Sequence, residues 1–217
     1  VVCNGLITGG NNVNFIDNTN TIFSIWDTKF ERTTKSLAQN ASLILDYDIN
    51  DKNALNITSN LSFSPNKTYD NKLVTLMQNA QQELDSTLNT KSNLDNDYTN
   101  LAVDLTYKYK PSKEGSSLIF NTHVTKFNEN QNQFVFSSYF LPNGNLNREY
   151  NFWTDNEQDI QIFTGQIDYS TPIGGFTFGS GAKVGKIQSE SEMIFYNVVD
   201  DNQIINNELS DNFDYDE

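Results

Sequence analysis

The sequence predicts an all-β protein, a segment of an antiparallel up-and-down transmembrane β-barrel with short periplasmic turns and long extracellular loops. Three observations support this prediction. Apolar and polar residues alternate with period two in several stretches of the chain. Short polar turns join these stretches in pairs, and polar segments of roughly thirty residues separate the pairs. Tyrosine recurs near the short turns on the apolar side of the strands.

The clearest hairpin occupies residues 41–63 and contains the run LILDYDINDKNALNITSNLSF. Leu43, Leu45 and Tyr47 alternate with polar neighbours such as Asp46, and the same period continues after the turn around Lys52. Two further hairpins are predicted at residues 100–127 and 159–186. The strands of all three should run for about nine to eleven residues, the length that a tilted strand needs to cross a bilayer.

Residues 64–99, 128–158 and 187–217 are predicted to be the long loops. Residues 71–88 carry apolar residues at helical spacing and are either a short helix or a loop element packed on the barrel. A short strand pair is expected at 134–139 and 148–153, and one strand at 193–199. In the first forty residues the expected elements are strands at 1–7 and 21–26, a connection at 9–20 and a polar run at 29–39.

The alternation of short and long connections favours a membrane barrel over a soluble domain. Connections in compact soluble domains are typically about four to six residues long, and several long ones are uncommon. Outer-membrane barrels combine short turns on the periplasmic side with long loops outside. The apolar face of the hairpins is therefore predicted to contact outer-membrane lipid, with Asp46 and Asp48 facing an aqueous or plug-filled interior. Tyr47, Tyr107, Tyr109 and Tyr169 are predicted to form an aromatic girdle at the membrane interface.

The hairpins resemble the outer membrane β-barrel family of TonB-dependent receptors of Gram-negative bacteria. The resemblance rests on LDYDINDKNALNITSNLSF, NLAVDLTYKYKPSKEGSSLIFNTHVTKF and QIFTGQIDYSTPIGGFTFGSGAKVG, and it covers roughly residues 43–186. It implies an outer-membrane transport protein whose full barrel encloses an N-terminal plug. Because the chain holds neither a plug nor enough strands, residues 1–217 are predicted to be one partial barrel, a fragment of such a receptor. The implied partners are the plug domain, the energy-coupling TonB protein and a surface lipoprotein.

Composition and motifs exclude several other functions. A net charge of −14 and a pI near 4.3 argue against nucleic-acid binding. His123 is the sole histidine and Cys3 the sole cysteine, so neither a histidine-based catalytic site nor a transition-metal site is predicted. Asp46-x-Asp48-x-Asn50 matches the start of a calcium loop, but Asp51 stands where the loop needs Gly and Ile57 where it needs Glu. The chain is predicted to be no enzyme and to bind no cofactor.

Two functions remain open from the sequence. The first is the barrel of a TonB-dependent receptor that imports a small ligand or an oligosaccharide, with Tyr139, Tyr150, Trp153 and Tyr196 as candidate ligand contacts in the loops. The second is a soluble or surface-attached β-sandwich that binds a glycan or a protein partner. The sandwich would bury Leu43, Leu45, Leu101, Leu105, Phe176 and Phe178 in one dry core.

Overall fold

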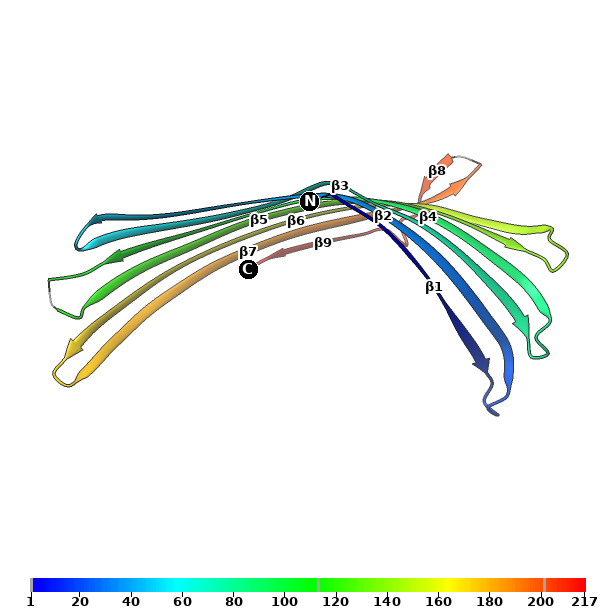
Figure 1. The fold of residues 1–217 in the computed structure, drawn as a ribbon, viewed down its shortest axis with the longest axis horizontal. Coiled ribbons are helices and arrows are strands. Elements are labelled where there is room, and N and C mark those ends of the chain that lie inside the picture. Colours follow the sequence, from blue (N-terminus) through cyan, green and yellow to red (C-terminus); the bar gives the residue numbers. More distant parts are fainter. Residues whose placement is uncertain (1, 113, 201) are drawn as a thin grey trace.

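The computed structural model describes residues 2–112, 114–200 and 202–217, and every regular element in them is a β-strand (Figure 1). The strands are β1 (Val2–Ile16), β2 (Ile22–Asn50), β3 (Asn53–Asn79), β4 (Leu84–Tyr109), β5 (Ser117–Phe140), β6 (Leu146–Ile173), β7 (Phe176–Val199), β8 (Asn202–Ile205) and β9 (Asp211–Asp216). They form one sheet in the order β1 to β8, with β9 paired to β7, and all pairs are antiparallel. The predicted all-β, antiparallel, up-and-down fold is confirmed.

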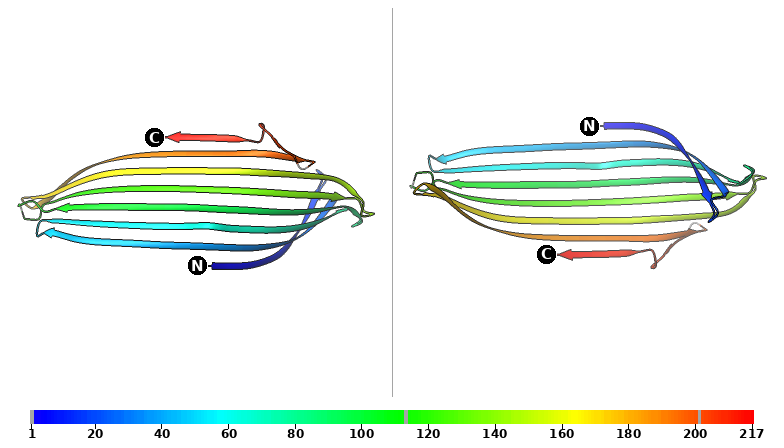
Figure 2. Two further views of the ribbon diagram at one scale, coloured as in Figure 1. Left: turned by 90° about the horizontal axis from the view of Figure 1, so that it is seen from above. Right: turned by 90° about the horizontal axis from the view of Figure 1, so that it is seen from below.

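The sheet is arched along its strands and strongly twisted, and its two edges do not meet (Figures 1 and 2). The turns β2–β3, β4–β5 and β6–β7 lie together at one end, which we call the proximal end. The turns β1–β2, β3–β4 and β5–β6 lie at the opposite, distal end. Twist of this kind is expected for tilted strands that wrap around a barrel axis.

The three predicted hairpins are present, with their turns at the proximal end. Residues 51–52 join β2 to β3, and residues 174–175 join β6 to β7. Gly174 has a φ of 62°, a conformation that glycine adopts without a steric penalty. The turn between β4 and β5 includes Lys113, which lies outside the described residues.

The prediction that residues 64–99, 128–158 and 187–217 are irregular loops is wrong. β3 and β4 continue through the first segment as one hairpin, and β5 and β6 continue through the second. In the third, β7 runs on to Val199 and then pairs with the short strands β8 and β9. The expected strand pair at 134–139 and 148–153 is confirmed within the second segment, as is the strand at 193–199.

Backbone pairing explains why these polar segments are strands. Cross-strand hydrogen bonds reinforce the ladder, such as Asn93 Nδ2 to Asp70 Oδ1 at 2.9 Å and the Thr28–Thr75 hydroxyl pair at 2.9 Å. The helix considered for residues 71–88 is absent, because those residues form the distal ends of β3 and β4. The predicted strand length is also wrong, since β2 to β7 each contain 24 to 29 residues.

The first forty residues are also more regular than predicted. β1 extends through most of the expected connection at residues 9–20, and the polar run at 29–39 is part of β2. A turn at residues 17–21 joins the two strands. The Asp17 carboxylate accepts hydrogen bonds there from the Thr19 hydroxyl at 2.6 Å and the Thr21 amide at 2.9 Å. Val1 of the predicted first strand lies outside the described residues.

The sheet formed by the described residues has no dry core, and this rules out the sandwich. Val135 is the one large apolar side chain that is buried among the described residues. Of the proposed sandwich core, Leu43 is 62% exposed and Phe176 is 84% exposed. All nine strands belong to a single sheet, so no second sheet covers these side chains. In the described residues no helix is long and apolar enough to cross a membrane.

The two faces of the sheet differ in chemistry and exposure. We call the face that carries Leu45, Leu105 and Phe163 the outer face, and the face that carries Asp46 and His123 the inner face. Four apolar outer-face residues of β5 and β6 are 43 to 47% exposed, namely Phe120, Val124, Phe163 and Ile167. The inner-face residues between them are half-buried. Side chains converge on the concave side of a curved sheet, so this difference places the inner face on the concave side of the arch.

Candidate functional site

The outer face of the proximal half carries a predominantly apolar band. One cross-strand row runs Tyr47, Leu55, Tyr107, Phe120, Ile167 and Ala182 from β2 to β7. On β4 the band extends from Leu101 to Tyr109, which is roughly 26 Å along the strand at about 3.3 Å per residue. At a strand tilt of about 40° this gives a height of roughly 20 Å, close to the apolar band of known outer-membrane barrels.

Polar side chains also stand in these rows, namely Ser59 opposite Leu43, Thr122 opposite Leu105, and Lys186 opposite Phe163 on β7. Thr122 lies on the outer face between Phe120 and Val124, and its hydroxyl donates to the backbone carbonyl of Thr164 at 3.0 Å. A satisfied hydroxyl costs little in an apolar environment, whereas a free one costs several kcal/mol. The outer face of the proximal half is therefore compatible with lipid at this position as well.

The structure brings the four predicted girdle tyrosines to one face and to neighbouring rows. Tyr47 and Tyr107 share a row through Leu55, and Tyr109 and Tyr169 share the next row toward the proximal turns through Leu118. The Tyr107 hydroxyl donates to Asn53 Oδ1. Their common depth is what an interfacial girdle requires, and the girdle itself stays a prediction.

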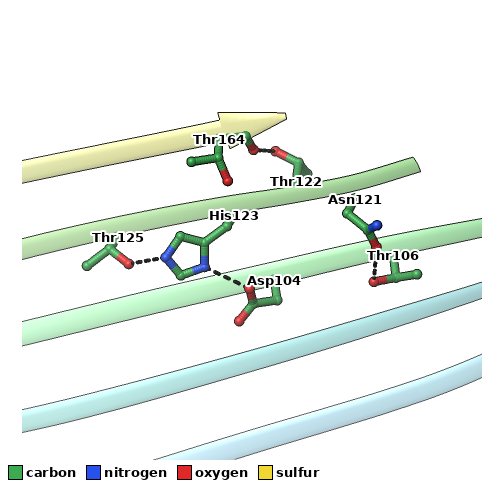
Figure 3. Close-up of polar contacts among 7 residues, drawn as sticks. All are labelled: Asp104, Thr106, Asn121, Thr122, His123, Thr125 and Thr164. Atoms are coloured by element: carbon green, nitrogen blue, oxygen red, sulfur yellow. Dashed lines mark hydrogen bonds and ion pairs between the residues drawn. The ribbon is translucent and has the colours of Figure 1, made fainter. Parts of the chain in front are cut away.

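The inner face of the proximal half is polar and hydrogen-bonded (Figure 3). His123 lies on this face, with Nδ1 at 2.7 Å from Asp104 Oδ1 across the β4–β5 pair and Nε2 at 2.7 Å from the Thr125 hydroxyl. One row away, the Thr106 hydroxyl donates to Asn121 Oδ1 at 2.8 Å. These contacts hold the polar side chains of the wall in place and give it a water-compatible surface.

Asp46 and Asp48 also lie on the inner face. Asp46 accepts a hydrogen bond from Asn56 Nδ2 at 2.6 Å across the β2–β3 pair. Within the described residues, no three side chains of His, Cys, Asp or Glu stand close enough together to hold a metal ion. The two carboxylates therefore act as part of the polar wall.

Comparison with known proteins agrees with this arrangement of faces. The family model described as the outer membrane protein beta-barrel family matches residues 109–217, just over half of the chain. The chain belongs to the outer membrane protein β-barrel family. It is therefore an outer-membrane protein, and this family is typically non-enzymatic. No curated protein matches the sequence.

In this barrel wall the four candidate ligand contacts do not form one surface. Trp153 and Tyr196 lie opposite each other on the outer face, in one row with Phe134. Tyr139 and Tyr150 lie on the inner face of the same distal hairpin. Tyr150 is 47% exposed, and its ring centroid lies 5.8 Å from that of Phe152. Only the inner-face pair lines the concave side of the barrel wall.

Cations on the inner face of the distal half are a feature that the sequence analysis missed. Arg32 lies with its guanidinium 5.6 Å from the centre of the Tyr69 ring, and Lys67 Nζ lies 5.1 Å from the same centre. Arg148 lies 4.3 Å from the centre of the Tyr139 ring. Lys67, Tyr69, Tyr139 and Arg148 fall in the segments predicted to be long loops, and Arg32 falls in the predicted polar run at 29–39. Lys67 and Tyr69 are two residues apart, so on a strand they share a face. This spacing is the signal that would have predicted the Lys67–Tyr69 contact.

The outer face of the distal half is strongly acidic. Directly paired carboxylates occur there, as at Glu157 and Glu192 in one row and Asp159 and Glu190 in the next. These rows line an open polar cleft of about 540 Å³ on β5, β6, β7 and β9. Lys126 Nζ, at 3.8 Å from Asp159 Oδ2, partly offsets the negative charge. These four carboxylates thus lie on the face opposite to Arg32 and Arg148.

Proposed function

We propose that this chain is part of the wall of a TonB-dependent outer-membrane receptor that imports a small ligand or an oligosaccharide. The observation that carries the proposal is the division of each long strand into two parts. The proximal part presents an apolar band to lipid and a polar wall to the interior. The distal part extends the wall outward and carries aromatic and cationic side chains on its inner face.

The open sheet supports a large barrel. Residues 39–50 of β2 and 176–186 of β7 have no strand on their second side among the described residues. Both stretches lie at the level of the apolar band, where unpaired backbone groups would cost several kcal/mol each. We infer that further strands pair with both edges and close the barrel, which leaves an interior wide enough for a plug.

The partners follow from the resemblance to TonB-dependent receptors. We propose that a plug domain fills the interior and contacts the polar wall around His123 and Asp46. The TonB protein would couple energy from the inner membrane to that plug, and a surface lipoprotein would contact the distal ends of the strands. In this proposal the ligand is captured between the distal hairpins, the plug rearranges, and the chain performs no catalysis.

Retention of TonB tests the proposal without knowledge of the ligand. The full-length protein, extracted in detergent, is immobilised and exposed to the purified periplasmic domain of TonB from the same bacterium. We expect TonB to be retained, and retention to fall when the segment ahead of the barrel is removed. A full-length protein that is folded, resists SDS until heated and yet retains no TonB would overturn the receptor proposal while leaving the barrel intact.

A further inference from the structure

The distal half of the inner face is an electropositive surface in a strongly acidic chain. The sequence has 28 Asp and Glu residues against 14 Lys and Arg residues. Even so, from the row of Asn96 and Gln131 to the distal turns, the described inner-face positions of β1 to β7 carry no carboxylate. Two carboxylates lie at the margin of this surface. Asp211 of β9 stands opposite Met193 in that same row, at the edge of the sheet. Glu129 lies one row below and accepts a hydrogen bond from Asn96 at 2.6 Å.

The cations on this surface are not neutralised by acids. Within the described residues, Arg32, Lys67 and Arg148 form no ion pair. The paired lysines lie on the outer face, as shown by Lys72 with Glu31 at 3.2 Å and Lys126 with Asp159 at 3.8 Å. Random placement of twice as many acids as bases would give the inner-face cations carboxylate partners too. The surface is instead left with a net positive charge.

All three cations lie beside a tyrosine ring. Arg32 and Lys67 flank Tyr69, and Arg148 lies over Tyr139. The Arg32 guanidinium also donates from Nε to Asn71 Oδ1 at 2.6 Å, which fixes its direction and leaves its terminal nitrogens free for a ligand. Both arginines are exposed. A planar guanidinium beside an aromatic ring suits a ligand that has an anionic group next to an apolar face.

The wall between Tyr69 and Tyr139 carries hydroxyl and amide groups among apolar side chains such as Leu94 and Val135. The Thr90 and Ser137 hydroxyls lie 3.2 Å apart across β4 and β5, and Asn71 Nδ2 donates to Ser92 Oγ at 3.0 Å. From the register, Tyr69 and Tyr139 are two strands and six residues apart, a distance of roughly 22 Å. Such a surface fits an extended, polyhydroxylated chain better than a compact one.

We propose that the distal inner face binds an acidic oligosaccharide, whose carboxylate or sulfate groups pair with Arg32, Lys67 and Arg148 and whose sugar rings stack on Tyr69 and Tyr139. This inference rests on the proposed receptor function and specifies its ligand. It disfavours cationic ligands, because the described positions of β1 to β7 on this surface offer them no carboxylate. It disfavours neutral sugars, since they would leave three cations without a partner.

Binding to the purified, detergent-extracted full-length protein tests the inference. The probes are tetragalacturonate and a chondroitin sulfate tetrasaccharide. Each is compared by calorimetry with its uncharged counterpart, which is the full methyl ester of the first and the desulfated, carboxyl-methylated form of the second. We expect at least one acidic probe to bind ten times more tightly than its uncharged form, or better. Charge-assisted hydrogen bonds of this kind are worth about 1.5 to 3 kcal/mol each, which corresponds to tenfold or more in Kd.

Substitutions on the inner and outer faces of the sheet test whether the distal inner face is the binding surface. Arg32→Gln and Arg148→Gln should each weaken binding of the acidic probe about tenfold or more and leave binding of the uncharged form unchanged. Lys91→Gln removes the same charge from the outer face of β4 and should leave both affinities unchanged. Equal binding of charged and uncharged probes, or equal effects of Arg148→Gln and Lys91→Gln, would overturn the inference. If TonB is retained while either of these results is obtained, the receptor function stands and only the proposed acidic ligand is wrong.

Discussion

A single arginine on either face of β4 tests the assignment of the two faces. Val103 lies in the apolar band on the outer face of the sheet, in one row with Val124 and Phe163. Its neighbour Ala102 lies on the inner face. Val103 is one row from Leu105 at the centre of the band. This spacing corresponds to roughly 7 Å along the strand and roughly 5 Å in depth.

The expected energies of the two substitutions differ clearly. Arginine on the lipid face costs about 2–4 kcal/mol at the midplane and less toward the interface, so Val103→Arg should cost about 2 kcal/mol. That lowers the folding equilibrium constant roughly thirtyfold. Ala102→Arg places the same charge on the water-compatible face and should change stability by about 0.5 kcal/mol or less.

Unfolding of the full-length protein by guanidinium chloride in phospholipid vesicles measures both free-energy changes. The slope m of unfolding free energy against denaturant concentration should be the same for all variants, which checks that the denatured state is unchanged. A loss with Ala102→Arg that equals or exceeds the loss with Val103→Arg would refute the assignment of outer and inner faces.

Three further predictions concern single positions. The pKa of Asp17 is lowered, first by the Thr19 hydroxyl and then by the Thr21 and Thr19 amides, so the carboxylate stabilises the β1–β2 turn above its unfolded pKa of 3.8 and loses that effect as the pH falls through the folded value. The protection of the Thr21 amide against hydrogen exchange, measured relative to its intrinsic exchange rate at each pH, should therefore fall as the pH drops below 3.8, and Asp17→Asn should remove this pH dependence. A Cβ at Gly181 would lie 2.8 Å from the Ile167 carbonyl, whereas at Gly179 the nearest atom is 3.9 Å away. Gly181→Ala should thus cost about 1–3 kcal/mol in the vesicle assay, and a similar loss with Gly179→Ala would contradict the steric explanation. Tyr47→Leu keeps apolar area but removes the polar tip, and it should cost about 1 kcal/mol if Tyr47 belongs to a girdle. Unchanged stability of that variant would count against the girdle.

The proximal half was predictable because lipid on one side and a polar interior on the other impose period two on the sequence. Alternation placed Leu45, Leu105 and Phe163 on one face and His123 on the other without knowledge of the structure. The partners of His123 were not predictable, because Asp104 lies nineteen residues away in sequence and meets it only through the β4–β5 register.

The distal half was not predictable from the same signal. There the outer face combines carboxylates with aromatic residues such as Trp153, and the inner face mixes hydroxyl, amide and aromatic groups, so no uniform apolar stripe marks the strands. Asn and Asp are depleted in strands in general, and the run Asn128 to Asn132 resembles a loop by composition. Pairing with neighbours that already form a sheet supplies the missing stability, because β5 continues without a register shift from Leu118 to Tyr139.

The regularity of the distal hairpins changes how ligand capture would work. Ordering a flexible loop residue around a ligand costs about 1–2 kcal/mol of backbone entropy. Tyr69 and Tyr139 stand instead on paired strands whose backbone is already fixed. Their separation and that of the cations over them are therefore set before the ligand arrives, and binding energy is not consumed in forming the site. A rigid wall of this kind selects for ligand length and charge spacing, which a set of mobile loops would tolerate more broadly. The proposed specificity for an extended acidic chain thus follows from the continuation of the strands beyond the membrane as much as from the residues they carry.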